Sequence, residues 1–223
     1  MPKIKMPKNS PSLDMTPMVD LAFLLVTFFM LTATTRVNEA VIVDTPSSHT
    51  QDLLPQNTVM LTISKEGNIF INMDNGDARL IALDSMSKRY NLTFTEKQKT
   101  AFARAGSFGM PIQNLGEFLS RDDVARSKTK QPGIPSDTTI VNNQLVDWLY
   151  YGYNAAGQSY NKMLAKARNA GVEPKIEKPR LSIKADAKTN YTVVQDVIDL
   201  IKKKKLEPRI NFITNLEGDE TTQ

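Results

Sequence analysis

The feature that most constrains the fold of this chain is an apolar run near its N-terminus. Between Leu21 and Leu31 the only polar residue is Thr27. The wider window of residues 15–33 would form a helix roughly 28 Å long, and the hydrocarbon core of a bilayer is about 30 Å thick. The run therefore predicts a single transmembrane helix, which we place at residues 14–35.

Charge on the two sides of the run predicts its orientation. Three lysines lie within the first eight residues and no acidic residue precedes Asp14, whereas Arg36 and Glu39 follow the run and cancel each other. Basic residues concentrate on the cytoplasmic side of membrane helices. We therefore expect residues 1–13 to be a cytoplasmic tail, and the chain after the helix to lie on the opposite side of the membrane.

Two other interpretations of the run are open. A cleaved signal peptide has a basic segment followed by an apolar core, but here Asp20 would stand directly against that core. An amphipathic helix of a soluble protein has a polar face, whereas residues 21–31 are apolar almost all round. A membrane span fits the pattern best.

Asp20, at the start of the run, has two interpretations. Thr16 followed by Pro17 is typical of a helix start, which would place Asp20 in the first turn, where the helix dipole stabilises a negative charge. If the helix begins earlier, near Ser10 or Ser12, Asp20 lies inside the bilayer. A carboxylate there costs about 2.5–3.5 kcal/mol unless it is protonated or faces a polar cavity. In that case Asp20 is a candidate proton-transfer residue.

Helical spacing places two hydroxyl groups on the same side as Asp20. Leu24, Thr27, Leu31 and Thr34 follow it at intervals of three or four residues. Thr27 and Thr34 are therefore candidates for a polar face that lines a pore. The alternative is that each hydroxyl donates to a carbonyl of its own helix, as threonines in membrane helices often do.

These N-terminal segments resemble one protein family. The sequence DMTPMVDLAFLLVTFFMLT, followed by VNEAVIVDTPSS, is similar to the ExbD/TolR family of biopolymer transport proteins. The family pattern is a short cytoplasmic tail, a Thr-Pro-x-x-Asp motif, one membrane helix and an extended periplasmic linker, which here corresponds to residues 36–57. The linker departs from the pattern at Asp44, Thr45 and Pro46, because the family usually has an aliphatic residue before this proline.

The resemblance implies a role for Asp20 and a set of partners. Asp20 would be the protonatable aspartate of a proton-driven motor in the bacterial inner membrane, with no cofactor other than protons. A homodimer would place its helices inside a ring formed by an ExbB-like multi-span subunit, and the periplasmic domains would engage a TonB-like protein. The resemblance thus implies a component that energises transport across the outer membrane and is not an enzyme.

The residues alone also allow a function of a different class. If Asp20 only caps its helix, the chain would be a membrane-tethered periplasmic binding or structural protein. Such a protein would have a TolR-like role in envelope integrity and would transfer no protons.

Residues 58–215 have the pattern of a small α+β domain. Alternating residues at 59–63 and apolar residues at 69–71 flank the turn sequence KEGN, which indicates a β-hairpin. A strand-helix-strand unit is indicated at residues 180–186, 191–205 and 209–214. We expect helices on one face of the sheet and a flexible C-terminal tail at residues 216–223.

Residues 74–179 exceed the usual length of the family and are expected to be a largely helical insertion. Helices are indicated at residues 95–105 and 146–170, each of which ends at a glycine, and a loop at 127–137 is indicated by its lysines, prolines and serines. The sequence does not separate an added partner-binding surface from a purely structural elaboration.

The composition excludes several other kinds of site. The chain has no cysteine and therefore no zinc-ligand spacing, and its one histidine, His49, lies in a polar linker, so neither a Ser/His/Asp triad nor a His-rich metal site is indicated. It also has no glycine-rich phosphate loop. Its basic residues are too scattered for nucleic-acid binding. The lysines at 202–205 suit the C-terminal end of a helix. An anionic partner such as peptidoglycan is the alternative explanation for them.

Overall fold

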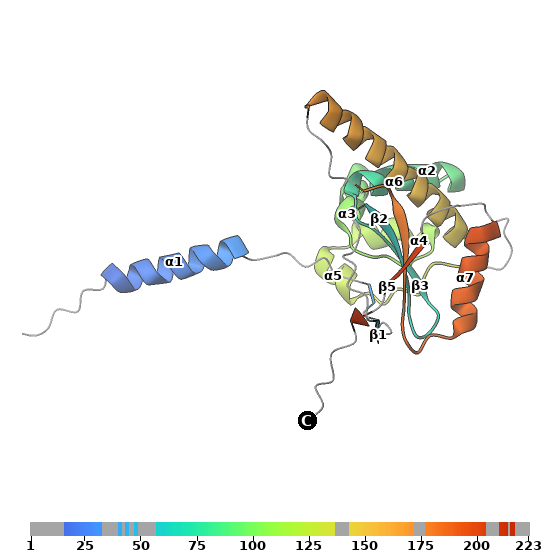
Figure 1. Ribbon diagram of the computed structural model, residues 1–223, viewed down its shortest axis with the longest axis horizontal. Coiled ribbons are helices and arrows are strands. Elements are labelled where there is room, and N and C mark those ends of the chain that lie inside the picture. Colours follow the sequence, from blue (N-terminus) through green and yellow to red (C-terminus); the bar gives the residue numbers. More distant parts are fainter. Residues whose placement is uncertain are drawn as a thin grey trace, which may run out of the picture. The chain divides into compact units, whose positions relative to one another are not determined.

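The computed structural model describes residues 16–32, 40–41, 43–44, 47–48, 57–136, 143–171, 177–203, 210–213 and 215–216. The chain divides after Arg36 into two units, and each is considered by itself. Within the described residues, the first unit contains one helix, α1 (Thr16–Thr32), and the second contains the strands and the other helices (Figure 1).

Helix α1 lies within the helix that the sequence predicts. It covers 17 residues, whereas the prediction runs over residues 14–35. Residues 14–15 and 33–35 lie outside the described part of the chain. Among the residues that are described, no helix combines the length and the apolar character needed to cross a membrane. The transmembrane helix over residues 14–35 therefore stays a prediction.

The second unit is built on a four-stranded sheet with the strand order β3-β2-β4-β5. Strands β2 (Thr58–Ile63) and β3 (Ile69–Met73) form an antiparallel hairpin. Strand β4 (Arg180–Ala185) lies parallel to β2 on one side and to β5 (Ile210–Ile213) on the other, and α7 (Tyr191–Lys203) lies between β4 and β5 in the chain. The predicted hairpin, the strand-helix-strand unit and the α+β class are confirmed.

One face of this sheet forms the hydrophobic core, because its strands present apolar side chains at every second position. Val59, Leu61 and Ile63 of β2 are fully buried there. Helices pack against the same face; their buried contributions include Leu83, Phe102, Leu115, Trp148, Val197 and Ile201. The helices thus cover one face, as predicted. Thr62 and Ser182 are buried on the other face.

The predicted insertion lies between β3 and β4 and is largely helical. Its helices are α2 (Gly76–Tyr90), α3 (Glu96–Arg104), α4 (Ile112–Ser120), α5 (Asp123–Lys128) and α6 (Gln144–Asn169). Helices α3 and α6 confirm the two predicted helices to within two residues at each end. The sequence indicated neither α2 nor α4, and α5 takes the first two residues of the expected loop. Helices α2 and α6 pack side by side (Figure 1).

A second, two-stranded sheet joins the linker to the far end of the domain. Strand β1 (Ser47–Ser48) lies in the predicted linker and pairs in parallel with β6 (Asn215–Leu216). The sequence did not indicate this pairing. Part of the linker is therefore hydrogen-bonded to the domain, and the domain extends one residue past its predicted end.

Arg79, near the start of α2, is 5% exposed and connects the insertion to the sheet. Its guanidinium donates hydrogen bonds to the carbonyl oxygens of Met73, Phe102, Ala105 and Gly106 and to the side-chain oxygen of Asn72. These acceptors belong to the end of β3 and to the end of α3 with the residues that follow it. The planar, multi-donor guanidinium suits such a set of converging carbonyls.

Burial also shifts the pKa values of Arg79 and of the nearby Asp74. Desolvation lowers the pKa of Arg79 to about 10, and the nearby Asp74 carboxylate opposes that shift. Burial likewise raises the pKa of Asp74, against the hydrogen bond that its carboxylate accepts from the Thr58 N–H at 3.2 Å. Arg79 thus remains a cation at neutral pH, with Asp74 as its nearby counter-charge.

Replacing Arg79 by Met keeps most of the apolar side chain but removes all its donors. The carbonyls would lose their partners and Asp74 its counter-charge, so we expect the unfolding free energy to fall by about 3–5 kcal/mol. Equilibrium urea unfolding of the full chain, followed by the fluorescence of its single tryptophan, Trp148, measures this change. The matched control is Arg104→Met at an exposed position, for which we expect a change within about 0.5 kcal/mol. Equal effects of the two substitutions would contradict this role of Arg79.

Candidate functional site

Asp20 is the fifth residue of α1 and its only charged residue. The first turn of the described helix contains no acidic residue. The N–H groups that lack a partner within a helix belong to its first turn. Asp20 therefore follows the first turn of the described helix. Residues 1–15 lie outside the described part of the chain, so both interpretations of Asp20 stay predictions.

The surroundings of Asp20 on α1 are mainly apolar. Thr16, Pro17, Val19 and Phe23 lie around it on the helix surface and form a shallow hollow. Val19 and Phe23 are 65% and 68% exposed, and the other large apolar side chains of α1 are also exposed. Among the described residues, helix α1 thus presents a carboxylate within an exposed apolar surface.

Of the two threonines predicted to line a pore, the structure describes Thr27 and not Thr34. Thr27 lies seven residues after Asp20, and its hydroxyl donates to the carbonyl oxygen of Leu24 at 2.9 Å. Its proton is therefore used within the helix, although its oxygen can still accept a hydrogen bond. Thr34 lies outside the described residues. A role for Thr27 and Thr34 in a pore stays a prediction, as does the role of Thr16 and Pro17, with which α1 begins.

In the second unit, the described linker residues Ala40, Val41, Val43 and Asp44, here called the strap, are docked on the domain. At one end, the N–H of Ala40 donates to the Oγ of Ser107 at 2.6 Å. At the other end, the N–H of Asp44 donates to Oδ2 of Asp186 at 3.2 Å, and its carbonyl accepts from the N–H of Ala187 at 2.7 Å. The strap is thus held at both ends.

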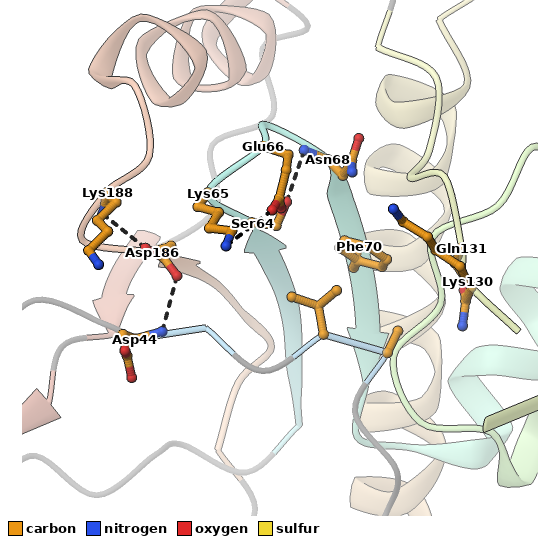
Figure 2. A pocket seen from close by; sticks show the side chains of 12 residues that line it. Asp44, Ser64, Lys65, Glu66, Asn68, Phe70, Lys130, Gln131, Asp186 and Lys188 are labelled. Carbon is orange, nitrogen blue, oxygen red and sulfur yellow. Dashed lines mark hydrogen bonds and ion pairs between the residues drawn. The ribbon is translucent and has the colours of Figure 1, made fainter. Parts of the chain in front are cut away.

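The strap also forms one wall of a cavity of about 480 Å³ (Figure 2). The cavity is lined by Ala40, Val41, Asp44, Ser64, Lys65, Glu66, Asn68, Phe70, Lys130, Gln131, Asp186 and Lys188. These residues come from the strap, the β2–β3 turn, the insertion and the turn after β4. The cavity is therefore complete only when the strap is docked.

Both signs of charge are present in this cavity. Three lysines and three carboxylates line it, and Lys65 lies 3.6 Å from Glu66. A hydrogen bond from Ser64 is the main cause that lowers the pKa of Glu66, and Lys65 adds to the effect. The described lining contains no histidine.

Sequence reasoning missed the anchors of the strap. Ser107 and Asp186 lie 67 and 142 residues away from the linker residues that they hold. Neither is part of a local motif, so only the folded chain brings them to the linker. A weak signal for the second anchor did exist, since Asp186 ends the segment RLSIKAD, which the sequence analysis identified as a strand.

No group of three or more His, Cys, Asp or Glu side chains within the described ranges could hold a metal ion. His49 lies outside those ranges. Among the predicted lysines at 202–205, Lys202 lies in the last turn of α7 with its Nζ 4.0 Å from Asp199.

Comparison with known proteins gives one match, and it covers the part of the chain with α1. Residues 6–106 match the family model of the biopolymer transport protein ExbD/TolR. No curated protein and no solved structure matches the chain significantly.

The family match bears on several predictions. ExbD/TolR proteins are transport components and not enzymes, which agrees with the expectation from the sequence. They are typically inner-membrane proteins and work with ExbB- and TonB-type partners. The matched region includes Asp20 and the strap, and ends one residue before Ser107.

Gly109 holds the wall of the cavity close to the sheet. A Cβ atom at this position would lie 2.3 Å and 2.6 Å from ring carbons of Phe70 and 3.0 Å from the Ile69 carbonyl oxygen. Its N–H also donates to Oε1 of Gln131 at 2.7 Å. A side chain here would therefore push the segment that carries Ser107 away from β3.

We expect Gly109→Ala to lower the unfolding free energy by about 1–3 kcal/mol through this overpacking. Urea unfolding followed by Trp148 fluorescence measures the change. The matched control is Gly157→Ala in α6, where an added Cβ meets nothing within 4 Å and should stabilise the helix by up to about 1 kcal/mol. A Gly109→Ala protein as stable as the parent would show that the close approach to Phe70 is not required.

Proposed function

We propose that this protein is a motor subunit of the inner membrane that uses the proton-motive force to energise transport across the outer membrane. In this proposal residues 14–35 cross the inner membrane, residues 1–13 are cytoplasmic and the α+β domain is periplasmic. Asp20 carries the protons. The observation that carries the proposal is a single carboxylate within an uncovered apolar helix, in the part of the chain that matches ExbD/TolR.

The exposed apolar surface of α1 supports a membrane location. Large apolar side chains on α1 such as Leu24, Phe28 and Leu31 are 58–88% exposed, and covering them with lipid or with a ring of partner helices would be favourable. The 17 described residues are roughly 26 Å long at 1.5 Å per residue. Extension to the predicted bounds would bring the helix to the thickness of the bilayer.

Protonation of Asp20 links the proton gradient to movement. An ionised carboxylate near the bilayer centre costs about 2.5–3.5 kcal/mol, so charged Asp20 prefers a hydrated or hydrogen-bonded site in the ring. Protonation removes most of that cost and lets the residue pass an apolar surface. Each proton that crosses a potential of 100 mV supplies about 2.3 kcal/mol. This energy is comparable to the cost, so protons that enter and leave on opposite sides can bias rotation of the helix.

The partners in this proposal follow from the family. Two copies of the chain form a homodimer inside a ring of ExbB-like subunits, and the periplasmic domains engage a TonB-like protein that transmits force. The lysines at the end of α7 would suit a contact with peptidoglycan. None of these contacts requires a cofactor other than protons.

Asp20→Asn tests the proposal, because asparagine has nearly the same size and cannot titrate. In cells with this chain as the only copy, we expect energy-dependent uptake to fall to the level of a deletion strain. Membrane insertion and association with the ring subunit, measured by fractionation and co-purification, should persist. Asp20→Glu should retain part of the uptake because it keeps a titratable carboxyl.

Asp14→Asn is the matched control, since it removes a nearby carboxylate outside the described helix. We expect uptake close to that of the parent. If Asp20→Asn supports normal uptake at a normal protein level, the motor proposal fails and a tethering role without proton transfer is favoured.

A further inference from the structure

The strap is anchored at one end by a residue from outside the family region. The ExbD/TolR match covers residues 6–106, and Ser107, whose Oγ accepts the Ala40 N–H at 2.6 Å, follows directly after it. The other anchor is the turn after β4, where Asp186 and Ala187 bond the backbone of Asp44. The two ends of the strap thus depend on different parts of the domain.

The segment that carries Ser107 is fixed to the sheet. Phe108 forms a two-way bridge with Ile71 of β3, with N–H to O distances of 2.8 Å and 2.9 Å. Gly133 donates to the Gly109 carbonyl at 2.8 Å and Ile134 donates to that of Ile69 at 2.8 Å, so a second stretch of the insertion supports the first. Ser107 therefore belongs to a segment that is hydrogen-bonded to strand β3.

We propose that this part of the insertion is a docking surface for the linker of the same chain, with Ser107 as the clip for the N-terminal end of the strap. The occupant is identified by the contacts, since the Ala40 N–H reaches Ser107 and Val43 is buried between the two anchors. The insertion thereby sets the length of free chain between α1 and the domain. This inference stands whether or not Asp20 carries protons.

Chain length gives the consequence of the clip. With Ala40 held, residues 36–39 lie between it and the predicted end of the membrane helix, and four residues span at most roughly 14 Å. With the clip open and Asp44 still held, residues 36–43 lie between the two points, and eight residues span at most roughly 29 Å. The clip therefore limits how far the domain can move from the helix to which it is tethered.

The test measures the distance between the linker and the insertion in the full chain. The protein has no cysteine, so Glu39→Cys with Lys130→Cys gives a unique pair of spin labels. We expect pulsed electron paramagnetic resonance to show a narrow distance distribution for the labelled parent. A broad distribution in this background would overturn the proposal.

Two independent substitutions each remove one partner of the hydrogen bond between the Ala40 N–H and Ser107 Oγ. Ser107→Ala removes the acceptor, and Ala40→Pro removes the donor without altering the domain. Each should shift the ratio of docked to released linker by roughly fivefold, the effect of one ordinary hydrogen bond. The double variant should show little further shift, because both changes remove the same bond.

Matched controls keep this result interpretable. Ser107→Thr retains the hydroxyl, Ala40→Gly retains the N–H, and Ser127→Ala removes an exposed hydroxyl on α5; all three should keep the narrow distribution. Unchanged Trp148 fluorescence would show that the domain is folded. If Ser107→Ala unfolds the domain, Ala40→Pro alone decides the question. An unchanged narrow distribution for Ala40→Pro would show that Ser107 is not the clip.

Discussion

The organisation of the domain depends on the burial of one guanidinium group. Arg79 satisfies carbonyl groups at the end of β3 and others that follow α3, so two parts of the chain meet at one cation. A buried cation without these partners would cost several kcal/mol. The residues after α3 are therefore fixed next to β3, where Phe108 can bridge to Ile71 and Ser107 can reach the linker.

The two units of the chain serve the proposed function in different ways. The first unit presents a carboxylate, Asp20, on an apolar helix whose large apolar side chains are exposed. The second unit has its own core and also holds part of the linker through the strap. Its cavity, with balanced charges, closes only with the strap in place. The linker thus belongs to the domain in structure, although it connects two units in sequence.

Local sequence signals predicted those parts of the fold that local interactions determine. The β2–β3 hairpin follows from alternation around the turn KEGN, where Gly67 adopts a φ of 81°. Helix α3 begins with a complete capping box formed by Thr95 and Gln98. Helix α2 was missed because Arg79 occupies a buried position within its apolar stripe, and a charged residue there hides the helical pattern.

The candidate sites show the same division. Asp20 could be identified from the sequence because a carboxylate within an apolar run is unusual at any position. Ser107 and Asp186 could not, because each acts on a linker backbone group distant in the chain. The lining of the cavity was also out of reach, since its residues come from four separate segments that only the fold unites.

Proton flux in a reconstituted system tests the central claim most directly. The chain and its ring subunit would be incorporated into vesicles that contain a pH-sensitive dye, and a potassium gradient with an ionophore would impose the membrane potential. The account predicts proton entry above that of vesicles with the ring subunit alone, and loss of this increment when Asp20 is replaced by Asn. An equal proton flux with asparagine at this position would contradict the account.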